Sequence, residues 1–136
     1  MSKTISYRLF GAGKIPAQQA AALQSEGVLV ADEGIHSSVT YLNFRSPGRI
    51  SKWKRQWYSA AIVLTRTWLV AFRGSHQIID VPLHDSRFQG LRFSIENQET
   101  LLVAFDASLF HVNWSGTIEY RFKTPLSKDF FNQLSG

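Results

Sequence analysis

The stretch that decides the fold of this chain reads RISKWKRQWYSAAIVLTRTWLVAFR and runs from Arg49 to Arg73. Its first half is basic and aromatic, and its residues alternate as they do in a β-strand with one solvated face. One side of the extended chain carries Trp53, Arg55 and Trp57, and the other side carries Lys52, Lys54 and Gln56. The alternation predicts a strand that begins near Arg49.

The second half of the stretch is apolar on both faces. Residues Ala60 to Leu64 are typical of a strand that passes from the rim of a sheet into a core covered on both sides. Thr65 to Thr67 supplies a turn, and Trp68 to Phe72 is a second apolar run. These features together predict an antiparallel hairpin.

Length and composition limit the number of domains, the types of metal site and the location expected for this chain. The chain has 136 residues, of which 44% are hydrophobic, so residues 1–136 are expected to form a single domain with a real core. Cysteine is absent, which excludes disulfides and thiolate metal sites. No run approaches the roughly 18 apolar residues of a membrane span, and the first residues lack the apolar core of a signal peptide. The expected location is cytoplasmic, with a peripheral membrane contact as an option.

The positive charge is local. The formal net charge is +5, but residues 34–79 contain seven basic residues and no acidic one. The remaining eight basic and ten acidic residues give the rest of the chain a net charge of −2. A basic patch is therefore expected around the central hairpin, where it would attract an anionic partner.

The rest of the chain is predicted to form β-strands between two helices. Pro16 to Ser25 is rich in helix formers and precedes Gly27, which predicts a short helix. Val28 to Phe44 predicts one or two strands, with a turn or bulge at Asp32 to Gly34. Arg45 to Arg49 has the Pro and Gly of a tight turn. Further strands are predicted at Gln77 to Leu83, Leu91 to Ile95, Thr100 to Phe105 and Thr117 to Lys123.

The two ends of the chain receive different predictions. Pro125 to Leu134 has an apolar stripe of helical period and Thr124 as its N-cap, which predicts an amphipathic C-terminal helix. Met1 to Phe10 is compatible with a short strand or a loose arm. Gly11 to Lys14 lacks the spacing of a phosphate loop and is better explained as a flexible linker.

Six or seven antiparallel strands followed by one C-terminal helix resemble a pleckstrin-homology-like barrel of the bacterial or GRAM type. The stretch Trp53 to Tyr58 (WKRQWY) looks like the basic, aromatic second strand of that family, and Ile62 to Val70 (IVLTRTWLV) is similar to its following hairpin. Ile79 to Leu83 (IDVPL) resembles the next strand. The resemblance covers about residues 27–134 and predicts a mainly β fold, with an N-terminal arm and short helix over residues 1–26.

The resemblance also implies a ligand site. In lipid-binding members the first hairpin loop and the basic second strand hold an anionic headgroup, because guanidinium and ammonium groups donate to phosphate. The residues of this chain in those positions are Arg45, Arg49, Lys52, Lys54 and Arg55. The arginine that ends the family motif is replaced here by Gln56, which supplies a neutral donor in place of a charged fork.

Simpler explanations compete with a ligand site. Lys52 and Lys54 on the solvated face of a strand are first of all solubilising residues. Trp53 and Trp57 are expected to pack in the core or at the mouth of the barrel, with Arg55 between them able to form a cation–π contact. No pair of residues has the types and spacing for catalysis or for metal binding, so no enzyme activity, cofactor or metal is expected.

Two classes of function follow. The first is a non-catalytic binding module that contacts an anionic membrane headgroup or an acidic protein surface through the basic loop and second strand. The alternative is a structural module that self-assembles or docks to another chain, and the sequence leaves the oligomeric state open. Nucleic-acid binding is disfavoured, because it requires Trp53 or Trp57 to lie outside the core.

Overall fold

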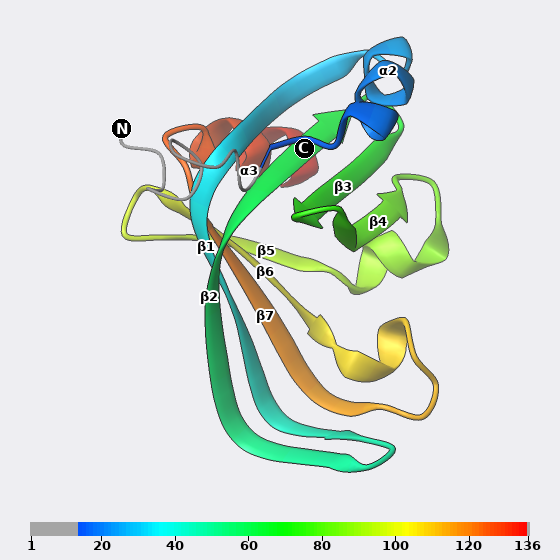
Figure 1. The fold of residues 1–136 in the computed structure, drawn as a ribbon, viewed down its shortest axis with the longest axis vertical. Coiled ribbons are helices and arrows are strands. Elements are labelled where there is room, and N and C mark those ends of the chain that lie inside the picture. Colours follow the sequence, from blue (N-terminus) through cyan, green and yellow to red (C-terminus); the bar gives the residue numbers. More distant parts are fainter. Residues whose placement is uncertain (1–13, 136) are drawn as a thin grey trace.

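The computed structural model describes residues 14–135, which form one antiparallel sheet with a short helix on either side of it in the sequence (Figure 1). The seven strands of this part of the chain follow the order β4-β3-β2-β1-β7-β6-β5. They are β1 (Val28–Ser46), β2 (Arg49–Thr65), β3 (Trp68–Arg73), β4 (His76–Pro82), β5 (Arg92–Glu96), β6 (Thr100–Asp106) and β7 (Ser115–Lys123). The helices are α2 (Ala17–Ser25) and α3 (Ser127–Ser135), with 3₁₀ turns η1 (Ser86–Gly90) and η2 (Ala107–Leu109).

The sheet does not close into a barrel. Strands β4 and β5 are its two edges, and no ladder joins them in the described part of the chain. Pro82 is the last residue of β4 and has no N–H to donate, and the chain then leaves through η1 before β5 begins. The prediction of a mainly β fold with two short helices is confirmed, whereas the prediction of a closed barrel is wrong.

Strand β1 is shared by the two halves of the sheet. It pairs with β2 along almost its whole length and with β7 over residues 37–45. The bulge predicted at Asp32 to Gly34 is present: the register shifts there, and Gly34 has a φ of 66°, which favours glycine. The Thr124 hydroxyl donates to Asp32 Oδ2 at 2.6 Å, which ties the bulge to the segment before α3.

The core has two parts because both faces of the second half of β2 are covered, as predicted. Ala60, Ile62 and Leu64 point inward to the main cluster, which also contains α3 residues. The neighbouring positions on β2 point outward and lie beneath α2. This smaller cluster consists of Leu23, Ala61, Val63, Val70 and Phe72. Helix α2 therefore covers one half of the outward face of β2.

The terminal helices agree closely with their predictions. Helix α2 follows Pro16 and ends at Ser25, just before Gly27, whose φ is 79°. Helix α3 begins two residues later than predicted, and the Thr124 hydroxyl accepts a hydrogen bond from the N–H of Leu126 at 3.1 Å. Phe130 and other residues of the predicted stripe pack against the core. The predictions for Met1 to Phe10, and for the glycines at 11 and 13, lie outside the described residues.

Candidate anion-binding site

The hairpin that joins β1 and β2 forms one end of the molecule's long axis, opposite α2 (Figure 1). Its turn is the one predicted from Pro47 and Gly48, and Gly48 has a φ of 78°, which a glycine adopts without strain. The register places Ser46 opposite Arg49 and pairs Arg45 with Ile50. The pairing therefore holds both arginines at the same end of the hairpin, with Arg45 on the face of Ile50 and Arg49 on the opposite face.

The five basic residues predicted to bind an anion are divided between two surfaces. Arg45, Arg49 and Lys52 are exposed at the end of the hairpin, and we call residues 45–52 the hairpin tip. Lys54 lies opposite Tyr41 and Arg55 lies opposite Thr40, so these two neighbours point to opposite faces of the sheet. None of the three tip cations forms an ion pair with another residue in the range 14–135.

The two tryptophans of β2 are on the outside, contrary to the prediction that they pack in the core or at the mouth of a barrel. Trp53 is 61% exposed and Trp57 is 70% exposed. The guanidinium carbon of Arg55 lies between them, 5.3 Å from the Trp53 ring centroid and 5.6 Å from that of Trp57, which confirms the expected cation–π contact. The prediction failed because α2 covers this face of β2 only at Ala61 and Val63. We call Trp53, Arg55 and Trp57 the tryptophan face.

A pocket of about 250 Å³ adjoins the tryptophan face at Trp57. Strands β1, β2 and β7 supply its walls, together with the end of β5, the following turn and the start of β6. The lining residues are His36, Ser37, Ser38, Arg55, Trp57, Glu96, Asn97, Thr100, Arg121 and Lys123. Ser38 pairs with Trp57 on one side and Arg121 on the other, is fully buried, and its hydroxyl has no hydrogen-bond partner among the described residues. We call this cavity the Ser38 pocket.

Charges in the Ser38 pocket are partly paired. Arg121 binds Glu96 with a 2.8 Å contact from Nε to Oε1 and binds Glu119 at 3.0 Å from Nη1 to Oε1. The hydrogen bonds from Arg121 lower the pKa of the Glu96 carboxyl below its ordinary value. Lys123 has no ion-pair partner in the part of the chain that the structure describes. The pocket therefore combines a fixed ion-pair network with cations that remain available to a ligand.

The sequence did not predict the Ser38 pocket, although it contained one signal. The alternation of Thr117 to Lys123 predicts that Arg121 and Lys123 lie on the solvated face of their strand, and both line the pocket. Which residues face them depends on the pairing of β7 with β1, which joins positions about 80 residues apart in the chain. No local pattern encodes that pairing.

The inward face of the same strands carries partly buried tyrosines that are unsuited to acid–base chemistry. Burial raises the pKa of Tyr58 and of Tyr120 far above the ordinary value, so both remain neutral. The Arg73 guanidinium lies 4.6 Å from the centroid of the Tyr58 ring and also donates to Gln56 Oε1 at 3.3 Å. These contacts give the tyrosines a packing role.

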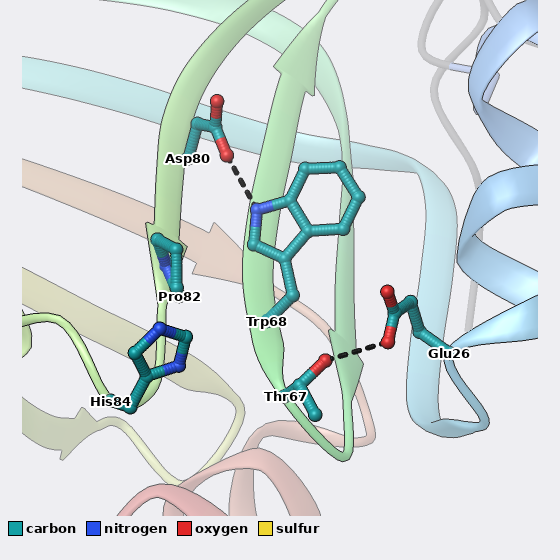
Figure 2. Close-up of a pocket in the computed structure, with 6 residues that line it drawn as sticks. All are labelled: Glu26, Thr67, Trp68, Asp80, Pro82 and His84. Atoms are coloured by element: carbon teal, nitrogen blue, oxygen red, sulfur yellow. Dashed lines mark hydrogen bonds between the residues drawn. The ribbon is translucent and has the colours of Figure 1, made fainter.

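A second cavity, of about 360 Å³, lies near α2 and is lined by Glu26, Thr67, Trp68, Asp80, Pro82 and His84 (Figure 2). Figure 2 shows the Trp68 indole between the two carboxylates. Both carboxylates are engaged: the Thr67 hydroxyl donates to Glu26 Oε2 at 2.8 Å, and the Trp68 Nε1–H donates to Asp80 Oδ1. These bonds join α2 to the β2–β3 turn and β3 to β4, which is a structural role.

Comparison with family models, with curated proteins and with solved structures finds no match to this chain. Within residues 14–135, no three or more histidines and carboxylates are grouped so that they could hold a metal ion. The helices described here are too short or too polar to span a membrane. The class that the geometry itself defines is an open antiparallel sheet protein with a cationic hairpin tip and an exposed aromatic face.

Proposed function

We propose that this chain is a non-catalytic binding module that contacts an anionic lipid surface through the hairpin tip. The observation that carries the proposal is the combination of charge and exposure at one end of the molecule. Arg45, Arg49 and Lys52 are exposed there, and the side chain between two of them, Ile50, is 72% exposed. An apolar residue ringed by cations is suited to the boundary between headgroups and acyl chains.

The position of the hairpin tip supports contact with a flat surface. The tip lies at the end of the long axis, so it can meet a membrane before the body of the domain does (Figure 1). A basic residue near an anionic leaflet contributes about 1 kcal/mol of attraction, and three such residues would contribute about 3 kcal/mol. Contact with an acidic protein surface would use the same charges, and vesicles made only of lipid test the membrane alternative directly.

The resemblance to pleckstrin-homology-like domains, stated above from the sequence, supports the same function. Seven antiparallel strands and a C-terminal amphipathic helix accompany the basic hairpin, although the sheet is open. Gln56 stands where the family motif has an arginine, and its side-chain oxygen accepts from Arg73. Because that position is neutral and engaged, we propose recognition of general negative charge and not of one particular headgroup.

The test is sedimentation with vesicles of phosphatidylcholine alone or mixed with phosphatidylserine. The double variant Arg49→Glu with Lys52→Glu should weaken binding to the anionic vesicles by at least ~30-fold, since two attractions of about 1 kcal/mol each are lost. Ile50→Ala should weaken it further, and the thermal transition should change little because all three residues are exposed.

The matched control is Arg92→Glu with Lys128→Glu, which reverses two exposed charges on β5 and α3. Both double variants lower the formal net charge from +5 to +1. Equal loss of binding in the two double variants would mean that net charge, and not the hairpin tip, attracts the vesicles. Equal retention of the parent and the tip variant would contradict the proposal outright.

A further inference from the structure

The tryptophan face is a row of two flat platforms with a cation between them. Trp53 and Trp57 are four residues apart on one strand, so their Cα atoms are about 13 Å apart. The Arg55 Nε–H donates to the Thr40 hydroxyl at 2.8 Å, which fixes this guanidinium against the sheet between the two indoles. Its remaining N–H groups form no hydrogen bond with other residues in the range 14–135, so they remain available for an anion.

The Ser38 pocket extends this row beyond Trp57. Its floor contains the fully buried Ser38 hydroxyl, which has no hydrogen-bond partner among the described residues. Leaving a buried polar group unpaired is costly, so such a hydroxyl at a cavity is evidence for a ligand with polar edges. Asn97 and Lys123, also in the lining, add an amide and an ammonium group. Stacking surfaces, hydrogen-bonding groups and free cations therefore adjoin one another.

This combination fits a nucleobase with its phosphate better than it fits a lipid. Glu96 and Glu119 on the same face are both paired with Arg121, which partly compensates their negative charge and leaves Arg55 and Lys123 to meet phosphates. The tryptophan face also leads along β2 from the hairpin toward the Ser38 pocket, whereas Ile50 lies at the end of the hairpin. Aromatic side chains interleaved with cations are the means by which sheets bind single strands, since bases stack on the rings and phosphates pair with the charges.

We propose that the tryptophan face and the Ser38 pocket together form a binding site for single-stranded nucleic acid. One base stacks on Trp57 with its polar edge toward Ser38 and Asn97, and another stacks on Trp53. Arg55 and Lys123 pair with the phosphates. A free nucleotide has the same base and phosphate chemistry, but it can occupy only one of two platforms about 13 Å apart. The site uses none of the residues of the hairpin tip, so it goes beyond the proposed membrane function.

The test is the fluorescence anisotropy of a labelled oligothymidylate of about 12 nucleotides, within the range of known single-strand sites. Trp53→Ala and Trp57→Ala should each weaken binding by about 5- to 150-fold, the effect of losing one stacked base. Trp57→Phe should retain most of the affinity, because an aromatic face remains. Val112→Ala, which trims another highly exposed apolar residue, is the matched control and should bind like the parent.

Salt provides an independent readout. Arg55→Ala and Lys123→Ala should each reduce the slope of log affinity against log salt by about 0.7, as expected when one phosphate contact to a single strand is lost. Thymidine monophosphate should compete with the oligonucleotide only weakly. If thymidine monophosphate competes as well as unlabelled oligonucleotide at the same concentration of nucleotide, the site takes one nucleotide and the proposal of a strand is overturned.

Three further outcomes would overturn the proposal. The first is equal affinity of the parent for duplex and for single-stranded oligonucleotide. The second is unchanged oligonucleotide affinity in the two tryptophan variants. The third is a parent that does not bind the oligonucleotide, with tryptophan variants that lose binding to vesicles. The hairpin-tip variant keeps the two proposals distinguishable. Arg49→Glu with Lys52→Glu should abolish vesicle binding while oligonucleotide binding still depends on Trp53 and Trp57.

Discussion

The outward face of β2 consists of two halves that resemble each other in sequence period and differ in what lies over them. Ala61 and Val63 are buried beneath α2, where Leu23 packs between the helix and the sheet. Trp53 and Trp57 continue the same face of the same strand toward the hairpin, and both are exposed. The larger apolar residues are therefore the ones that face solvent.

This difference teaches that hydrophobicity does not by itself bury a strand residue. A strand offers two faces, and each is covered only where another element reaches it. Helix α2 has nine residues and covers only the part of β2 beyond the bulge in β1. Exposed tryptophans in the uncovered half are then candidates for contact with a partner, as large exposed apolar side chains often are.

The largest expected effect comes from removing a side chain that packs against the covered half. Phe72 of β3 pairs with Ala61 and is fully buried in the cluster beneath α2, so Phe72→Ala should lower the free energy of unfolding by about 3–5 kcal/mol. Trp57→Ala removes a larger side chain from the uncovered half, yet it should cost no more than ~1 kcal/mol, the value of an exposed cation–π contact. Urea unfolding of both variants measures the contrast. Equal destabilisation would show that the two halves are covered alike.

A smaller effect is expected from the ion pair beside the uncovered half. Arg121 lowers the pKa of Glu96, so the folded state gains stability from the carboxylate above the ordinary pKa of about 4.5 and loses it as the pH falls through the lower folded value. Glu96→Gln should therefore be less stable than the parent at pH 7, by less than about 1 kcal/mol because the carboxylate is 36% exposed.

The difference between parent and Glu96→Gln should shrink as the pH falls below about 4.5, because the parent carboxyl then becomes protonated as well. Thermal unfolding at several values between neutral and acidic pH measures this. A difference that stays constant over the whole range would mean that the charge of Glu96 contributes nothing to the stability of the fold.

The smallest effect is spectroscopic and leaves stability unchanged. Of the four tryptophans, Trp53 and Trp57 are exposed, whereas Trp68 and Trp114 are partly buried. Replacing both exposed residues by phenylalanine should reduce the quenching of tryptophan fluorescence by acrylamide and move the emission to shorter wavelength. Replacing Trp68 by phenylalanine should have the opposite effect on the average quenching and emission wavelength of the remaining tryptophans. Unchanged quenching in the first variant would place the exposed pair in a covered environment.

Local sequence features predicted most elements of the fold. The strand period, the Pro–Gly turn after Arg45, the bulge near Gly34 and the cap at Thr124 are all present, because each depends on residues close together in the chain. Closure of the sheet was predicted wrongly. Whether β4 meets β5 depends on how the whole sheet curves around its core, and no short motif specifies that.

The candidate sites divide in the same way. The cations of the hairpin tip were found from sequence, since they cluster around one turn. The Ser38 pocket was missed, because its residues come from β1, β2, β7 and the β5–β6 hairpin and are joined only by strand pairing. The exposure of Trp53 and Trp57 was missed as well, since it depends on the reach of α2.

The sequence by itself determined the strands, the turns, the two helices and the concentration of positive charge around the central hairpin. Periodicity, backbone angles and formal charge act over a few residues, so they can be inferred without coordinates. Only the tertiary structure decided which apolar face is covered, whether the edges of the sheet meet, and that a buried serine lies beside an exposed tryptophan. Those outcomes depend on contacts between residues far apart in the chain, where packing and not local preference sets the result.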